Sequence, residues 1–242
     1  MNMSVRRIGV IYPENGILEQ EFEKFAPQEV TLHFTRSRWP ASEWFRPNWP
    51  DRMASLADDP DIAACAKLFN QIDPAVVTFA CTSASFAAGA GGDLAVLENI
   101  RRGTNAKASS TSTAYLAACS ALGIKRVAIA SVYVESVTRR FVDFLSGGGV
   151  ETVSHQSVGW ERQPELTAED VFRLASECDH PDAQVILIPQ TNILTSELIP
   201  LVEERLGKPV LTAIQVTVWH AVRLAGSSWD GGIGRVWKEN QV

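Results

Sequence analysis

The sequence predicts an α/β protein made of two similar halves, each with a parallel sheet of four strands. Short apolar runs alternate with amphipathic helical stretches along all 242 residues. Several of these runs, such as residues 127–130, are apolar on both faces, which is typical of strands in a parallel sheet covered by helices. The order also repeats, because the run at residues 76–79 that leads to Cys81 returns at residues 185–188 and leads to Gln190.

The predicted elements follow from periodicity along the chain. We expect strands at residues 6–12, 29–35, 75–80, 106–110, 126–131, 150–156, 184–188 and 209–212. Helices lie between them, including residues 16–25, 55–72, 134–146, 167–178 and 195–206. The division predicted from the repeat assigns residues 1–115 and 214–242 to an N-terminal half and residues 116–213 to a C-terminal half. A single eight-stranded doubly wound domain is the alternative.

Polar residues follow two of the predicted strands. These are Cys81-Thr82-Ser83 in the first half and Gln190-Thr191-Asn192 in the second. A strand-to-helix turn presents backbone N–H groups that bind anions, and ligands of such sheets lie outside the carboxyl ends of the strands. Tyr133 also falls at a strand end. We therefore expect one cleft between the halves that holds a carboxylate, with a thiol on one side.

Bulk composition excludes several other classes. The net charge is −6 without a basic stripe, which argues against nucleic acid as a partner. The sequence contains no apolar run of about 18 residues, the length that would predict a membrane span. The start of the chain lacks a secretory pattern, so a cytoplasmic protein is expected. The four cysteines and four histidines show no metal-ligand spacing, and the cysteines are expected to be reduced.

The segment at residues 39–50 breaks the α/β pattern. It carries Trp39, Trp44 and Trp49 out of seven tryptophans in the chain, together with three prolines. Such a segment is neither a regular helix nor a regular strand. It is interpreted either as a stiff lid or pocket wall that suits a larger substrate, or as an aromatic loop packed on its own core or at a subunit contact.

Several short motifs in this order resemble the maleate cis–trans isomerase and arylmalonate decarboxylase group of the aspartate/glutamate racemase superfamily. They are Pro13-Glu14-Asn15, Phe34-Thr35-Arg36, Cys81-Thr82-Ser83, Tyr133, Gln190-Thr191-Asn192 and the ending at residues 219–226. The resemblance covers nearly the whole chain. It implies two Rossmann-like halves related by a pseudo-two-fold axis, a small carboxylate substrate in the cleft, no metal or organic cofactor, and a possible homo-oligomer.

The resemblance also implies how the thiol is used. Racemases of the superfamily use two facing cysteines as acid and base. Maleate isomerases keep both and use the first as a nucleophile, and arylmalonate decarboxylase lacks the first and uses the second as a proton donor. In this sequence Cys81 stands at the first position and Gln190 at the second. A glutamine amide does not exchange a proton near neutral pH, which argues against a symmetric racemase.

The leading hypothesis is therefore maleate-like cis–trans isomerisation. A thiolate of Cys81, stabilised by a helix N-terminus, adds to the double bond and an enediolate forms in the adjacent carboxylate. Rotation and expulsion of the thiolate give the trans acid. The first alternative is a decarboxylase of malonate-type acids with Cys81 as the proton donor. The second is a carboxylate-binding protein without catalysis.

The remaining site residues are assigned from the same resemblance. Thr82, Ser83 and Tyr133 are the expected donors to the enediolate, with the backbone N–H groups of Thr191 and Asn192 facing them. Helix capping by the first two and aromatic packing by Tyr133 are the alternatives. Asn15 resembles the asparagine that binds a substrate carboxylate in maleate isomerases, although Asn15-Gly16 is also a turn signal. Gln163 stands where that group has another asparagine.

Overall fold

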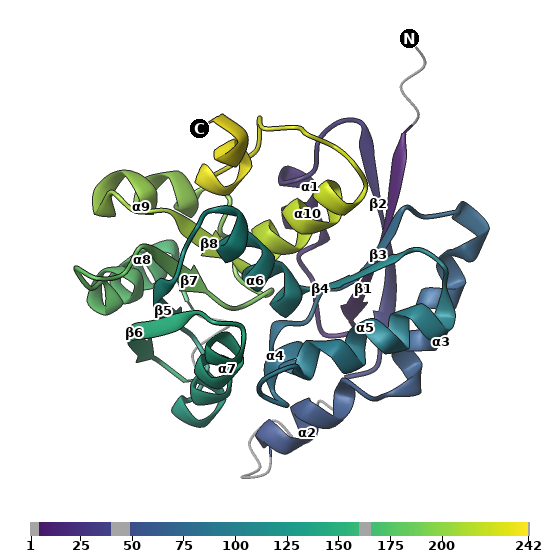
Figure 1. Cartoon of the computed structure of the whole chain (residues 1–242), viewed down its shortest axis with the longest axis horizontal. Helices are drawn as coiled ribbons and strands as arrows, with labels where there is room; N and C mark the ends of the chain where they lie inside the picture. The colour runs from purple at the N-terminus through teal and green to yellow at the C-terminus, as the bar shows by residue number, and fades with distance from the viewer. Residues whose placement is uncertain (1–4, 40–48, 160–165, 242) are drawn as a thin grey trace.

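Two parallel sheets of four strands each form the centre of the protein (Figure 1). The computed structural model describes residues 5–39, 49–159 and 166–241. The first sheet has the order β2-β1-β3-β4 and the second the order β6-β5-β7-β8. Equivalent strands therefore hold the same place in both sheets. This confirms the predicted pair of similar halves, and the alternative of one eight-stranded sheet is wrong.

The predicted strands are all present, with ends that differ by at most two residues. They are β1 (Arg6–Pro13), β2 (Val30–Ser37), β3 (Val76–Phe79), β4 (Lys107–Ser110), β5 (Arg126–Ser131), β6 (Glu151–Ser157), β7 (Val185–Ile188) and β8 (Val210–Thr212). Every residue of the inner strands β3 and β7 is buried, whereas the edge strands β2 and β6 are largely half-buried or exposed. The inner strands are apolar on both faces because helices cover both sides of each sheet.

Helices connect the strands and cover the sheets. They are α1 (Glu19–Lys24), α2 (Trp49–Leu56), α3 (Pro60–Leu68), α4 (Thr82–Phe86), α5 (Gly92–Gly103), α6 (Thr111–Ala121), α7 (Glu135–Gly147), α8 (Ala168–Cys178), α9 (Leu198–Leu206) and α10 (Ala213–Leu224), with 3₁₀ helices at Phe69–Ile72 and Arg235–Gln241. Within the described part of the chain, no helix is both long and apolar enough to cross a membrane.

The single helix predicted at residues 55–72 is wrong. Asp59 has an extended backbone, and its side chain accepts a hydrogen bond from the Asp61 N–H, so that α3 begins at Pro60. A proline at the first helical position lacks the N–H that would otherwise be unsatisfied, and an aspartate before it caps the helix. The signal for a new helix start was therefore present in the sequence.

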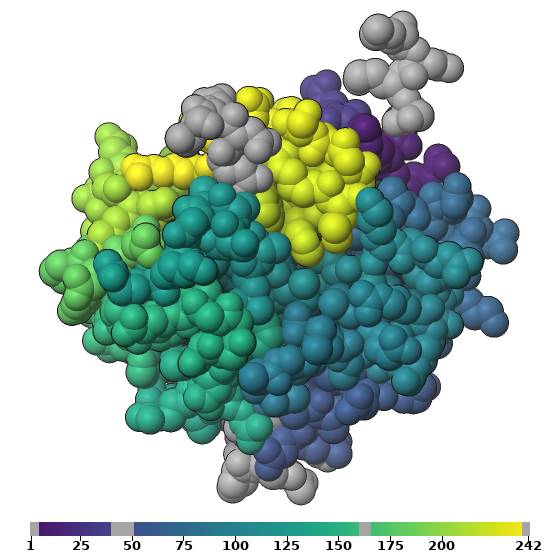
Figure 2. All heavy atoms as spheres, viewed as in Figure 1, coloured from purple at the N-terminus to yellow at the C-terminus, as the bar shows by residue number. Residues whose placement is uncertain are grey.

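Helices α6 and α10, which follow β4 and β8, pack against each other between the sheets (Figure 1). The hydroxyls of Thr111 and Thr217 lie 2.8 Å apart between these helices, and Tyr115 Oη donates to the Ile188 carbonyl oxygen of the second half at 2.7 Å. Figure 2 shows the two halves in contact across this face. The predicted boundary at residue 115 falls inside α6, and the exact division of the chain stays a prediction.

A second connection between the halves holds the loop at residues 190–196. Tyr12 Oη lies 2.9 Å from the Thr191 carbonyl oxygen. Further along the loop, a carboxylate oxygen of Glu21 accepts the backbone N–H groups of Thr195 at 2.7 Å and Ser196 at 2.6 Å. Glu21 is only 1% exposed. A buried carboxylate is tolerated when its oxygens are hydrogen-bonded in this way, so α1 and the loop stabilise each other.

We predict that Glu21→Ala lowers the free energy of unfolding by about 2–3 kcal/mol, because two buried N–H groups lose their acceptor. Urea denaturation followed by circular dichroism measures the loss. Glu23→Ala on the same helix is the matched control, since Glu23 is exposed, and it should change stability by less than about 0.5 kcal/mol. Equal effects of the two substitutions would contradict the role given to Glu21.

Candidate active site

All of the predicted site residues line one pocket at the carboxyl ends of the strands. They are Asn15, Cys81, Thr82, Ser83, Tyr133, Gln190, Thr191 and Asn192, joined by Tyr12, Pro13 and Trp39. Both halves contribute, as the paired strand ends predicted. In the described ranges no cluster of three or more His, Cys, Asp or Glu side chains could hold a metal ion.

Buried hydroxyls bind the backbone carbonyl groups of the Cys81 turn. Strand β3 ends at Phe79 and α4 begins at Thr82, which makes Cys81 the residue before the helix. Ser85 Oγ lies 2.9 Å from the Cys81 carbonyl oxygen and 2.6 Å from Ser112 Oγ, and Ser112 Oγ lies 3.2 Å from the Thr82 carbonyl oxygen. Carbonyl groups that are bound in this way keep the turn in one conformation, so α4 and α6 together fix the position of the thiol.

Burial controls the protonation of the Cys81 thiol. The residue is 4% exposed, and burial raises its pKa to about 11, although the Ala84 N–H and the Ser83 hydroxyl act to lower it. The expected thiolate at the helix N-terminus therefore stays a prediction, because burial acts against the charged form. Helix α4 has five residues, and its N-terminus does not outweigh the cost of a buried negative charge. At neutral pH the group is a thiol.

Three hydroxyls stand beside this thiol. Ser83 Oγ lies 3.9 Å from Cys81 Sγ and donates to Met53 Sδ at 3.6 Å. Because a thioether is a weak acceptor, the Ser83 hydroxyl can readily donate its hydrogen bond to a stronger acceptor instead. Burial raises the pKa of Tyr133, the nearby Cys81 raises it further, and the hydroxyls of Thr82 and Ser83 lower it. Tyr133 thus remains a protonated donor. Its ring packs edge-to-face with that of Phe86, with the two ring centroids 5.8 Å apart.

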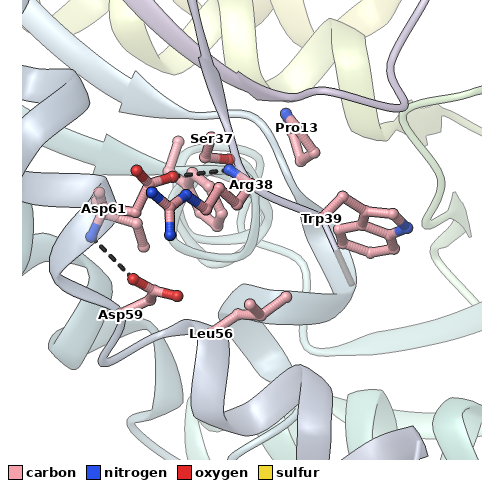
Figure 3. A pocket seen from close by; sticks show the side chains of 9 residues that line it. Pro13, Ser37, Arg38, Trp39, Leu56, Asp59 and Asp61 are labelled. Atoms are coloured by element: carbon pink, nitrogen blue, oxygen red, sulfur yellow. Dashed lines mark hydrogen bonds between the residues drawn. The ribbon is translucent and has the colours of Figure 1, made fainter. Parts of the chain in front are cut away.

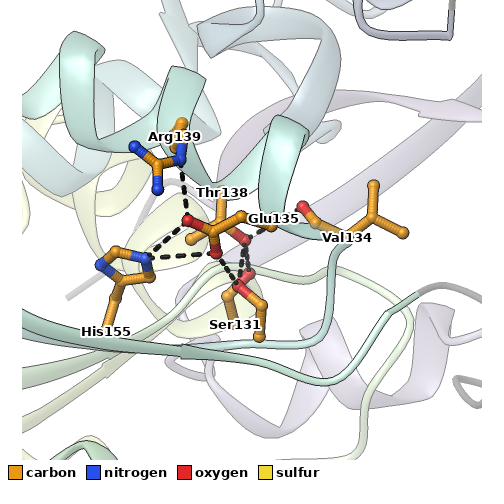
Figure 4. A network of polar contacts seen from close by, with 7 residues as sticks. Ser131, Val134, Glu135, Thr138, Arg139 and His155 are labelled. Carbon is orange, nitrogen blue, oxygen red and sulfur yellow. Dashed lines mark hydrogen bonds and ion pairs between the residues drawn. The ribbon is translucent and has the colours of Figure 1, made fainter. Parts of the chain in front are cut away.

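A polar network fixes the backbone that carries Tyr133 (Figure 4). The Tyr133 N–H donates to Ser131 Oγ at 3.2 Å, and Ser131 Oγ lies 2.7 Å from Thr138 Oγ1 on α7. The network continues to Glu135, which His155 and Ser157 contact at 3.2 Å. Although burial acts to raise the pKa of the Glu135 carboxyl, these two partners hold it below its ordinary value. The strand end at β5 is thereby tied to α7 and β6.

The second turn differs from the prediction. No helix follows Gln190 directly, since the next one, α9, begins at Leu198. The Asn192 N–H was expected to face the substrate, but it donates to Oε1 of Gln190 at 3.2 Å. The turn is therefore closed by the side chain of Gln190, and it is held by Tyr12 of the first half rather than by a helix.

The aromatic segment reaches the pocket through Trp39. This residue is 7% exposed and lies between the pocket and a neighbouring hollow that Leu56, Asp59 and Asp61 line (Figure 3). Its backbone N–H donates to Glu14 Oε1 at 3.0 Å. Trp39 therefore forms a wall of the pocket. Residues 40–48, with Trp44, lie outside the described residues, as does Gln163.

Sequence reasoning missed Tyr12 and Met53. Tyr12 is buried at the end of β1, lines the pocket and contacts both Thr191 and Asn192. Its signal was its place at a strand end, the same signal that led to Tyr133. Met53, on α2, contacts Ser83, and no pattern in the sequence pointed to it. Arg36 does not line the pocket, because its guanidinium stacks on the Tyr12 ring at 5.2 Å and pairs with Glu19.

Comparison with known proteins agrees with this architecture. The family model described as arylmalonate decarboxylase matches residues 56–237. The chain is 34% identical to arylmalonate decarboxylase of Bordetella bronchiseptica over 173 residues, which are 69% of this chain and 72% of that protein. The chain belongs to the arylmalonate decarboxylase family.

Solved structures extend the likeness to the whole chain. A variant of arylmalonate decarboxylase that combines a glycine-to-cysteine and a cysteine-to-serine substitution, in its liganded form, superimposes with a TM-score of 0.82 at 29% identity, covering 97% of this chain and 99% of that one. A cysteine-to-serine variant of Nocardia farcinica maleate cis–trans isomerase with a covalently bound succinylcysteine intermediate also has a TM-score of 0.82, at 20% identity, covering 97% and 98%. The relatives of this family member are enzymes, either isomerases or decarboxylases.

The raised pKa of Cys81 has a measurable consequence, because the thiolate is the form that reacts with iodoacetamide. We predict that the rate of Cys81 alkylation rises about tenfold per pH unit from pH 7 to pH 9.5 without levelling. Peptide mass spectrometry separates Cys81 from the other cysteines. A rate that levels near pH 8 would show that the thiol is activated in the free protein, against the burial argument.

Proposed function

We propose that this protein decarboxylates a malonic acid that carries an aryl or alkyl substituent. The carrying observation is the buried thiol of Cys81, which is protonated at neutral pH and lines a pocket shared by the two halves. Among the described lining residues, the other titratable groups are Tyr12 and Tyr133, and burial keeps both protonated. The pocket therefore offers proton donors and hydrogen-bond donors, which is what a dianionic substrate and an enediolate need.

The reaction begins when one carboxylate of the substrate leaves as carbon dioxide. The electron pair of the broken carbon–carbon bond moves into the remaining carboxylate and forms an enediolate. Cys81 Sγ–H then donates its proton to the α-carbon, which yields the monocarboxylate and a thiolate. The raised pKa of the thiol makes this thiolate a strong base, so it takes a proton from water and the enzyme is restored.

The hydroxyls beside the thiol suit the enediolate intermediate. Thr82, Ser83 and Tyr133 act as donors to its two oxygens, and each donor of this kind contributes a factor of about 10²–10³ in rate. The proposal draws support from the position of Ser83, whose hydroxyl donates to a weakly accepting thioether sulfur, and from Tyr133, which is kept protonated. These donors are buried, so they lose little to competition with water.

Maleate-like cis–trans isomerisation is the second candidate. It is favoured by the position of the thiol at the first turn, with Asn15 in the same pocket, and by the covalent succinylcysteine in the Nocardia farcinica variant. It requires Cys81 to attack as a thiolate. A substrate with two negative charges would raise the pKa of the thiol further, beyond the effect of burial, which is why the proton-donor mechanism is preferred.

We predict that the wild-type protein releases carbon dioxide from phenylmalonate, and that Cys81→Ser lowers kcat by about 10²–10⁴, because a serine hydroxyl is a much weaker acid. Carbon dioxide release and phenylacetate formation are measured together, and fumarate formation from maleate is measured in parallel. Cys65→Ser is the control, since Cys65 is a buried thiol outside the pocket, and it should keep full activity.

The outcomes separate the candidates. Fumarate from maleate without decarboxylation, lost in Cys81→Ser, would favour the isomerase. Equal activity of wild type and Cys81→Ser on both substrates would remove Cys81 from the mechanism altogether.

A second thiol should change the stereochemistry. With Cys81 alone, the proton arrives on one face of the planar enediolate, so methylphenylmalonate gives one enantiomer of 2-phenylpropionate. We predict that Gln190→Cys adds a thiol on the opposite side, lowers the enantiomeric excess and accelerates α-deuterium uptake from D₂O by the product acid. Gln190→Ser removes the amide without adding a thiol and is the control. Deuterium uptake unchanged by Gln190→Cys would contradict the facing arrangement.

A further inference from the structure

We propose that Tyr12 is a positioning residue that orients the carboxamide of Asn192 as a hydrogen-bond donor to the substrate carboxylate. This inference rests on the proposed function, because it assigns the second turn to carboxylate recognition. It begins from the difference between the two turns. Hydroxyls of α4 and α6 hold the Cys81 turn from beneath, whereas the chain from Gln190 to Leu194 belongs to no regular element. Such a segment needs support from elsewhere to keep one conformation.

Tyr12 itself is held firmly. Its side chain is 1% exposed. The ring centroids of Tyr12 and Phe22 lie 5.1 Å apart in an edge-to-face arrangement, and the guanidinium carbon of Arg36 lies 5.2 Å from the Tyr12 ring centroid. Gly16 passes so close that an added Cβ would lie 2.2 Å from the end of the phenol ring. The absence of a side chain at this position lets the loop after β1 close over Tyr12. Strand β1 and these contacts therefore hold the Tyr12 hydroxyl in place beside the second turn.

The hydroxyl makes two contacts in the second turn. Tyr12 Oη lies 2.9 Å from the Thr191 carbonyl oxygen and 2.7 Å from Oδ1 of Asn192. Burial raises the pKa of Tyr12, although the Leu18 N–H and Arg36 act to lower it, so the hydroxyl keeps the one proton that it shares between these two acceptors. Because Oδ1 of Asn192 faces Tyr12, the Nδ2 donors of that amide are left for a ligand in the pocket that Asn192 lines.

The contact with Thr191 extends to Gln190. The Thr191 C=O and the Asn192 N–H belong to one trans peptide group and point in opposite directions. Tyr12 holds the carbonyl side, and Oε1 of Gln190 accepts the N–H side at 3.2 Å. The peptide group between Thr191 and Asn192 is therefore held on both sides, by Tyr12 and by Gln190. One hydroxyl of the first half thereby sets the direction of the Asn192 carboxamide and fixes the peptide group to which Gln190 is bound.

The test compares Tyr12→Phe with Tyr115→Phe. Tyr115 is a matched control because it is also buried and also donates to a backbone carbonyl at this end of the second sheet, that of Ile188, but it does not line the pocket. Each substitution removes one buried hydroxyl, and both should lower Tm by a similar amount, about 2–4 °C.

The readouts that separate the two variants are ligand affinity and local exchange. Calorimetric titration with malonate should show about a tenfold rise in Kd for Tyr12→Phe and less than a twofold rise for Tyr115→Phe. In turnover of phenylmalonate, KM should rise by a similar factor while kcat changes less than about twofold. Hydrogen–deuterium exchange of ligand-free protein should become faster at residues 190–193 in Tyr12→Phe.

Two results would overturn the proposal. One is wild-type exchange at residues 190–193 in Tyr12→Phe, and the other is an equal loss of malonate affinity in both variants. Failure of wild-type protein to bind malonate would count against the proposed function, and the exchange measurement would still decide whether Tyr12 positions the turn.

Discussion

The site depends on the contacts by which the first half holds the loop at residues 190–196 of the second half. The Tyr12 hydroxyl binds the beginning of this loop and the buried Glu21 carboxylate binds its end. Together with the packing of α6 against α10, these contacts fix the distance between the strand ends of the two sheets. A pocket formed by two halves keeps its shape only when such contacts resist relative movement, and both here are removed from water, where hydrogen bonds to charged and polar groups matter most.

Burial decides the chemistry inside this pocket. A helix N-terminus favours a thiolate, but desolvation of Cys81 is the larger effect and the thiol stays protonated. The same burial keeps Tyr12 and Tyr133 protonated. The described lining residues are thus neutral, without lysine, arginine or histidine. An anionic substrate would provide the charge in such a site, and its negative charge would strengthen each hydrogen bond that it accepts.

Much of this architecture could be predicted from the sequence because the same pattern of strands occurs twice along the chain. Apolar runs on both faces identified the strands, and the polar residues that follow them identified both turns. Protonation of Cys81 was not predictable from local sequence, since it depends on how far packing buries the side chain, which is 4% exposed. The closure of the second turn by Gln190 was missed for a related reason. Its partner Tyr12 is far away in sequence, and a turn signal does not reveal which side chain will hold it.

The two turns share a position in the repeat but differ in what supports them, and this difference fits a division of roles. Proton transfer requires a fixed distance, and the Cys81 turn is held by a buried hydroxyl network within its own half. Binding a carboxylate requires donors that can be oriented, and the second turn presents the Asn192 carboxamide, whose oxygen atom is engaged by Tyr12. A pair of identical thiols would require both turns to hold a proton donor at a fixed distance from the substrate. Replacing one thiol by Gln190 releases the second turn from that demand, which is consistent with a reaction that needs a proton on one face only.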